Sequence, residues 1–228
     1  GAILEAQGKD ATFNLNVQID SDYVRIENDG GAIISGVGND HTVNFTVNAI
    51  GDDSVYGDNL DDQELSVDIS SYNSGGMIDL TGDRANVHFD VTYSPLSNPF
   101  AETSGGVFLN TQYSGGSLVE ITGRDSVVDI NLTGAVVVSG GGIARVIGDN
   151  ATINVIAQDT ETDAFFSGGA SWQLNDGILV QGNNAAVSLD VEGRLQDNGK
   201  PFDISWNGSG GSALIDVYGS NSDISATI

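Results

Sequence analysis

One short unit recurs seven times along this chain and constrains its fold more than any other feature. The unit holds a short apolar strand, a polar turn that contains a glycine, and a second strand of alternating character; residues 75–91 read GGMIDLTGDRANVHFDV. Successive turn glycines are separated by 30, 44, 41, 25, 34 and 37 residues, and they are Gly8, Gly38, Gly82, Gly123, Gly148, Gly182 and Gly219. Repetition at this length predicts a solenoid, in which each unit packs against the next.

The second strand of each unit has the same pattern when the seven turns are aligned. The residues five and seven positions past each turn glycine are apolar: Phe13, Val43, Val87, Val128, Ile153, Val187 and Ile224, then Leu15, Phe45, Phe89, Ile130, Val155, Leu189 and Ala226. The residues between them are polar: Asn14, Asn44, His88, Asp129, Asn154, Ser188 and Ser225. Because successive side chains of a strand point to opposite faces, we expect the apolar sets inside and the polar set outside.

A third strand precedes most of the units, as in LSVDISSYNSGG (65–76) and FDISWNGSGG (202–211). Three strands per unit with one inward face predict an all-β parallel β-helix with three strands per coil and about seven coils. Residues 1–228 would then form a single domain, roughly 30–35 Å long at about 4.8 Å per coil. The alternative is a β-sandwich or barrel, which would need hairpins with two-residue turns and no long period.

The charge balance excludes several classes of partner. Seven Lys and Arg against 32 Asp and Glu give a formal net charge of −25, which repels nucleic acid and anionic membrane surfaces. No run of about 20 apolar residues is present, so we expect no direct membrane insertion by this segment. Cysteine is absent, which excludes disulfides, thiolate metal sites and cysteine nucleophiles.

The length variation falls between the second and third strands of the units. Insertions confined to one corner of a solenoid often form its binding surface. Two of them supply candidate partner-binding residues, which are Asp52, Asp53, Asp58, Asp61, Asp62 and Glu64 in one and Asp159, Glu161 and Asp163 in the other. These carboxylates would bind a basic partner or Ca²⁺, which takes about six to eight oxygen ligands. The alternative is a solvated loop whose charge keeps the protein soluble.

The outward strand positions supply the remaining candidates, which are Asn14, Asn44, Asp129 and Asn154. They form amide ladders between coils or offer donors and acceptors to a partner chain. Outward Asp90, Asp129 and Asp190 could instead act as paired acids in polysaccharide cleavage. With few basic residues available, we predict no catalytic residue. We also predict no metal site and no cofactor, since the two histidines, His41 and His88, occupy different positions of the coil.

The chain begins almost directly on a repeat and stops inside the second strand of the last one. A solenoid normally has capping units at its ends. We therefore expect this sequence to be a segment of a longer protein.

The combination of GG-x-hydrophobic strands, G-(D/N)-x-(A/S) turns and V-x-F-x-V strands resembles the passenger domains of Gram-negative (type V) autotransporters. Among these, it is most similar to the adhesins of the AIDA, antigen-43 and pertactin type. The resemblance covers all 228 residues and implies a right-handed β-helix that is displayed at the bacterial outer membrane or secreted.

The resemblance also implies a function in cell adhesion, biofilm formation or virulence. The expected partner is a host glycan, an extracellular-matrix protein, or identical chains on neighbouring cells. Two alternatives stay open: a polysaccharide-processing enzyme, such as a lyase or glycoside hydrolase, and a structural spacer that binds nothing.

Overall fold

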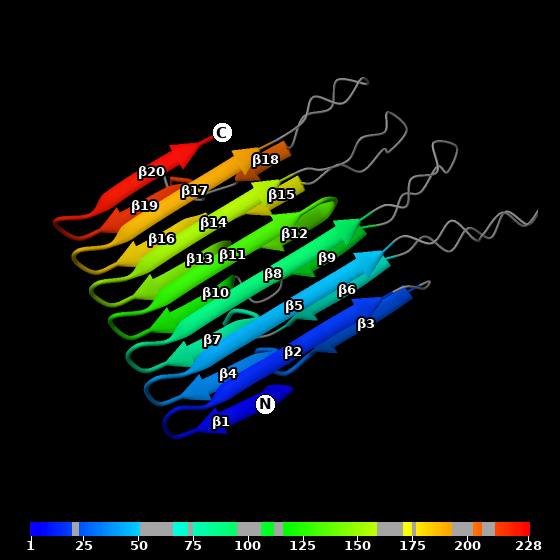
Figure 1. Ribbon diagram of the computed structural model, residues 1–228, viewed down its shortest axis with the longest axis horizontal. Helices are drawn as coiled ribbons and strands as arrows, with labels where there is room; N and C mark the ends of the chain where they lie inside the picture. The colour runs from blue at the N-terminus through cyan, green and yellow to red at the C-terminus, as the bar shows by residue number, and fades with distance from the viewer. Residues whose placement is uncertain are drawn as a thin grey trace, which may run out of the picture.

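The computed structural model describes residues 1–19, 23–50, 66–72, 75–94, 106–111, 116–158, 171–174, 177–192, 203–206 and 213–228. Within these ranges the chain forms strands and turns, without a helix. The strands are arranged as three parallel sheets that stack coil upon coil, with the N- and C-termini at opposite ends of the stack (Figure 1). No helix of the described residues is long and apolar enough to cross a membrane.

Each sheet takes one strand from each successive unit. The first sheet contains β1 (Leu4–Gln7), β4 (Ile34–Val37), β7 (Ile78–Thr81), β10 (Ser117–Thr122), β13 (Gly142–Ile147), β16 (Ile178–Gln181) and β19 (Ile215–Tyr218). The second sheet contains β2 (Thr12–Ile19), β5 (Thr42–Ile50), β8 (Asn86–Ser94), β11 (Val127–Thr133), β14 (Thr152–Gln158), β17 (Ala186–Glu192) and β20 (Asp223–Thr227). The third sheet contains β3 (Tyr23–Asn28), β6 (Ser66–Ser71), β9 (Gly106–Asn110), β12 (Val136–Gly140), β15 (Ser171–Leu174) and β18 (Asp203–Trp206).

Every strand pair among the described residues is parallel, and each joins the same element of two successive units. The predicted all-β parallel β-helix with three strands per coil is therefore confirmed, and the alternative of an antiparallel sandwich or barrel is wrong. The right-handed sense and the number of coils stay predictions.

The interior is built from the alternating residues of the three sheets. Val43, Val87 and Val128 are completely buried, and they lie opposite one another on β5, β8 and β11. The rings of Phe45 and Phe89 stack between neighbouring coils, with centroids 4.4 Å apart and planes 4° apart. Because strand pairing aligns apolar residues of successive coils, register decides which side chains are buried.

The expectation of an apolar interior is wrong at the last strand, β20. Ile224 is 48% exposed and Ala226 is also exposed. The reason is that β20 lies at the edge of the second sheet and pairs only with β17. At the other edge, the inward residues of β2 range from buried Phe13, 7% exposed, to partly buried Leu15, so an edge coil buries its inward side chains incompletely.

The turn glycines stack directly over one another between the first and second sheets. A Cβ atom added to Gly82, Gly123, Gly148, Gly182 or Gly219 would overlap the carbonyl oxygen of the turn glycine in the preceding coil. At Gly123, Gly182 and Gly219 the backbone is not left-handed, so the close approach of two backbones, rather than φ, requires glycine there. This contact explains why the glycine recurs in every unit.

The second residue past each turn glycine has a left-handed backbone, with φ between 58° and 65°. These residues are Asp10, Asp40, Arg84, Asp125, Asn150, Asn184 and Asn221. Asp and Asn adopt this conformation more readily than other residues that carry a Cβ atom. The exception is Arg84, whose guanidinium donates two hydrogen bonds to Asp40 of the preceding coil, at 2.5 and 2.8 Å.

One turn carries a buried imidazole where most other coils have alanine. His41 is 1% exposed, its ring packs edge-on against Phe13, and neither ring nitrogen has a hydrogen-bond partner among the described residues. The neighbouring inward position of β4 is Gly36, where a Cβ atom would lie 3.0 Å from His41 Cδ2 and 2.8 Å from Leu80 Cδ2. The imidazole therefore fills the space that Gly36 leaves in this coil.

The connection from the second to the third sheet is short in the fourth unit, where only Gly134 and Ala135 separate β11 from β12. In other units the segments 51–65, 95–105, 159–170 and 193–202 lie at this place in the chain, outside the described residues.

Candidate functional site

The outer face of the second sheet gathers the polar residues that the sequence places outside. Strand pairing aligns them in rows that run along the rod. We call the first the Asn14 row, and it consists of Asn14, Asn44, His88, Asp129, Asn154, Ser188 and Ser225. We call the second the Asn16 row, and it consists of Asn16, Thr46, Asp90, Asn131, Ile156, Asp190 and Thr227.

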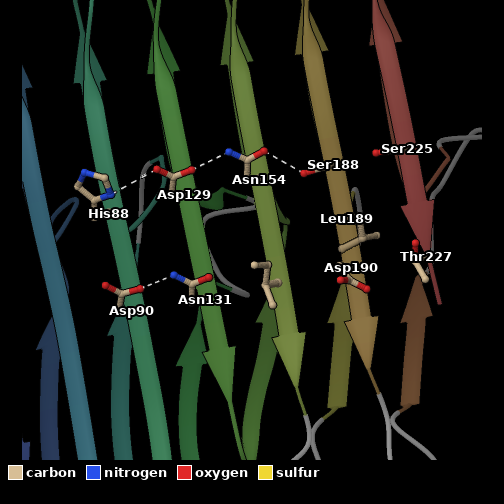
Figure 2. Close-up of a pocket in the computed structure, with 11 residues that line it drawn as sticks. His88, Asp90, Asp129, Asn131, Asn154, Ser188, Leu189, Asp190, Ser225 and Thr227 are labelled. Carbon is tan, nitrogen blue, oxygen red and sulfur yellow. Dashed lines mark hydrogen bonds and ion pairs between the residues drawn. The ribbon is translucent and has the colours of Figure 1, made fainter.

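Polar contacts join four successive side chains of the Asn14 row, from His88 to Ser188 (Figure 2). Ser188 Oγ donates to Asn154 Oδ1 at 2.9 Å, and Asn154 Nδ2 donates to Asp129 Oδ1 at 2.7 Å. On the other side, His88 Nδ1 lies 3.4 Å from Asp129 Oδ2. The carboxylate of Asp129 thus lies between an asparagine amide that donates to it and an imidazole nitrogen in ion-pair range.

The sequence-predicted residues Asn14, Asn44, Asp129 and Asn154 all belong to this row. Asn44 Nδ2 donates to Asn14 Oδ1 at 2.8 Å, which is one amide–amide contact of the kind predicted, whereas Asn154 bonds to Asp129 and Ser188 instead of to another amide. It forms a separate pair at the N-terminal end, while Asp129 and Asn154 lie together near the middle (Figure 2).

The Asn16 row is only partly hydrogen-bonded. Asn131 Nδ2 donates to Asp90 Oδ1 at 2.6 Å. The exposed carboxylate of Asp190 has no hydrogen bond or ion pair with any described residue. Between Asn131 and Asp190 lies Ile156, which is 39% exposed. This part of the face therefore offers free polar groups beside an apolar patch.

An open groove of about 570 Å³ follows the two rows across β8, β11, β14, β17 and β20 (Figure 2). Its sides run from His88 and Asp90 at one end to Ser225 and Thr227 at the other. Because the side chains come from stacked strands, the groove is parallel to the rod axis and would take an elongated ligand.

The charge of this face is strongly negative. The outward carboxylates of its strands are Asp90, Asp129, Asp190, Glu192 and Asp223, and these strands contain no Lys or Arg. A ligand with cationic groups, or a neutral one, is compatible with this surface, whereas an anionic ligand would be repelled.

Two arginines, Arg84 and Arg124, pair with carboxylates at the turns, away from the groove. The Arg84 side chain, by hydrogen bonding to Asp40, holds the pKa of that carboxyl below its usual value. The backbone N–H of Arg124 and then its guanidinium, at 3.2 and 3.1 Å, lower the pKa of Asp83 in the same way. These pairs leave the negative charge of the groove unneutralised.

The candidate acids of the enzymatic alternative lie on this face, but two are already engaged. Asp90 and Asp129 come from the neighbouring strands β8 and β11, and each carboxylate accepts a hydrogen bond from an asparagine amide. The described part of the chain contains no cluster of three or more His, Asp or Glu side chains suited to a metal ion.

The predicted binding residues of the two acidic insertions lie outside the described residues. These are Asp52, Asp53, Asp58, Asp61, Asp62, Glu64, Asp159, Glu161 and Asp163. Their roles stay predictions.

Two features of this molecule escaped the reasoning from sequence. One is Ile156, although its position eight past Gly148 falls in the outward register, where an apolar residue is a detectable signal. The other is a carboxylate pair on the outer face of the first sheet, where Asp79 and Glu120 face each other across β7 and β10 beside Gly75. Burial of Asp79 raises the pKa of its carboxyl above 3.8.

Asp79→Asn is expected to stabilise the protein at pH 7 by less than about 1 kcal/mol, because the half-exposed charge is screened by water. A raised folded-state pKa favours folding at low pH, and this contribution is lost as the pH rises from 3.8 through the folded pKa. The gain should therefore vanish near pH 3. Urea unfolding at both pH values measures it, and an equal effect of the substitution at the two pH values would contradict the expectation.

No protein-family model, curated protein or solved structure matches this chain significantly. We therefore infer its function from the geometry of the rod and of its polar face.

Proposed function

We propose that this chain is a non-enzymatic binding segment of a bacterial surface adhesin. The observation that carries the proposal is the groove on the outer face of the second sheet, with its hydrogen-bonded Asn14 row and its partly unpaired Asn16 row. The rod acts as a stiff support, and the face binds a partner at the cell exterior.

The Asn14 row supports this function because its side chains are ordered before any ligand arrives. Asp129, Asn154 and Ser188 each have a fixed hydrogen-bond partner, so little side-chain freedom is lost on binding. The rows repeat in every coil, and repeated weak contacts along a rod gain strength by multivalency. We also propose that an autotransporter displays this segment at the outer membrane, as the sequence pattern suggests.

The partner would be a host glycan, a matrix protein or an identical chain. A single experiment tests all three: beads coated with the protein are scored for adhesion to glycan-coated and matrix-coated surfaces and for clumping with one another. The double variant Ser188→Arg/Asp190→Arg places two long cationic side chains in the groove from β17. We expect it to reduce adhesion or clumping at least tenfold.

A matched control keeps the charge change the same on another face. Glu5→Arg/Gln7→Arg alters two exposed outward residues of β1 in the first sheet and adds the same net charge. It should adhere like the unmodified protein. Equal loss in both variants, or no loss in either, would exclude the groove as the binding site, and absence of binding by the unmodified protein would favour a structural spacer.

The enzymatic alternative has one observation in its favour, the presence of Asp90, Asp129 and Asp190 along one groove. It predicts new reducing ends or unsaturated products when the protein is incubated with acidic and neutral polysaccharides. Product formation that disappears in Asp129→Asn would replace the adhesive function with a catalytic one.

A further inference from the structure

The groove combines carboxylates with an exposed apolar side chain, and this combination favours one class of partner. We propose that it binds a basic polypeptide segment in extended conformation, laid along the rod axis over the Asn16 row. This inference rests on the proposed function, since it names the partner of the same face.

Charge complementarity is the first argument. Asp90 and Asp190 carry the two carboxylates of the Asn16 row, and Asp129 adds a third from the adjacent row. Within the described strands of this sheet no Lys or Arg neutralises them. The carboxylate of Asp190 has no partner in the described structure and is open to a cation.

The spacing along the row is the second argument. Asp90, Asn131, Ile156 and Asp190 occupy four successive strands in register. Strands lie about 4.8 Å apart, so the two carboxylates are about 14 Å from each other. An extended peptide rises about 3.4 Å per residue, so side chains i and i+4 lie on one face, also about 14 Å apart. Lysines at i and i+4 therefore match Asp90 and Asp190.

The apolar patch between the carboxylates is the third argument. The side chain at i+2 of such a peptide points the same way and lies over Asn131 and Ile156. Because Ile156 is 39% exposed there, an aliphatic residue at i+2 would cover apolar surface that water now contacts. Asn154 and Ser188 in the neighbouring row lie beside the path of the peptide backbone, as donors and acceptors.

The probe is the synthetic peptide Thr-Lys-Thr-Val-Thr-Lys-Thr with blocked ends, titrated into the intact protein and followed by isothermal titration calorimetry. A peptide of the same composition with its lysines at i and i+3 is the control, because its two cations point to opposite sides. We expect the i, i+4 peptide to bind at least fivefold more tightly. Raising the salt concentration from about 0.01 M to 0.15 M should weaken it several-fold, because the Debye length shortens from about 30 Å to about 8 Å.

The protein variants test the same geometry from the other side. Asp90→Asn/Asp190→Asn removes both charges but keeps the oxygen that accepts from Asn131, and it should abolish the preference for i, i+4 spacing. Glu192→Asn/Asp223→Asn removes two charges from the same face outside the Asn16 row and should keep it. Equal binding of both peptides, or no binding of either, would overturn the inference.

The outcome separates this inference from the proposed function. If Ser188→Arg/Asp190→Arg abolishes adhesion while neither peptide binds, the face recognises another class of partner, such as a neutral glycan or a second copy of the chain. If the peptide with lysines at i and i+4 binds preferentially but the beads do not adhere, the inferred class of partner is supported and the proposed adhesive function is contradicted.

Discussion

Gly82→Ala is expected to lower the free energy of unfolding by about 3 kcal/mol or more, a large effect for the addition of one methyl group. The added Cβ would overlap the carbonyl oxygen of Gly38 in the coil below. Neither atom belongs to a flexible side chain, so the backbones of the two coils must separate, and the hydrogen bond from Gly38 N to Thr81 O at 2.8 Å, which joins these coils, would be strained.

Gly8→Ala is the matched control for that substitution. Gly8 occupies the same position of the turn with a similar backbone, φ 127° against 144° for Gly82, but nothing lies within 4 Å of an added Cβ. It should cost only about 1–2 kcal/mol, from the unfavourable backbone conformation. Chemical denaturation of both variants measures the difference, and similar losses would mean that backbone conformation, not stacking, selects these glycines.

The second large effect concerns the pair of Gly36 and His41. Gly36→Val alone is expected to destabilise the protein by about 2 kcal/mol, because its side chain would crowd both the imidazole of His41 and the end of the Leu80 side chain. His41→Ala alone leaves a cavity against Phe13. The double variant restores the arrangement of three other coils, which have Leu80, Val146 or Val180 at the first position and alanine at the second.

A double-mutant cycle measures this exchange. We expect a coupling of about 2 kcal/mol and a double variant within about 1 kcal/mol of the unmodified protein, since two buried nitrogens without partners are removed together with the clash. Thermal or urea unfolding of the four proteins is sufficient. Additive losses would show that the two residues fill separate spaces.

Much of the fold could be predicted from sequence because each unit repeats the same local pattern. A turn glycine followed by alternating apolar residues, as at Gly82, Val87 and Phe89, fixes both strand direction and inward face. The exposure of inward residues on the edge strand β20 could not be predicted from this pattern. Ile224 follows the pattern of an interior residue and is nevertheless exposed, because burial depends on the neighbouring coil and not on the strand itself.

The candidate site could be predicted in part. The outward positions of Asn14, Asn44, Asp129 and Asn154 follow from the alternation, and the structure places all of them in one row. The sequence could not predict which side chains of different coils form hydrogen bonds or ion pairs with one another. Asp129 accepts a hydrogen bond from Asn154 and lies 3.4 Å from His88 Nδ1, while Asp190 has no partner among the described residues, and this difference depends on which residues the register aligns.

The parallel pairing of the strands has a mechanical consequence. In a parallel β-helix the backbone hydrogen bonds between coils run along the length of the rod, so tension applied at its two ends loads them in series. The weakest link then yields first, and the outermost turn of chain is released while the remainder keeps its shape. The repeats are 25 to 44 residues long, so each coil that detaches would add that many residues to the extended chain. The added length would lower the tension before the next coil detaches. A tether built like this would lengthen in steps under load.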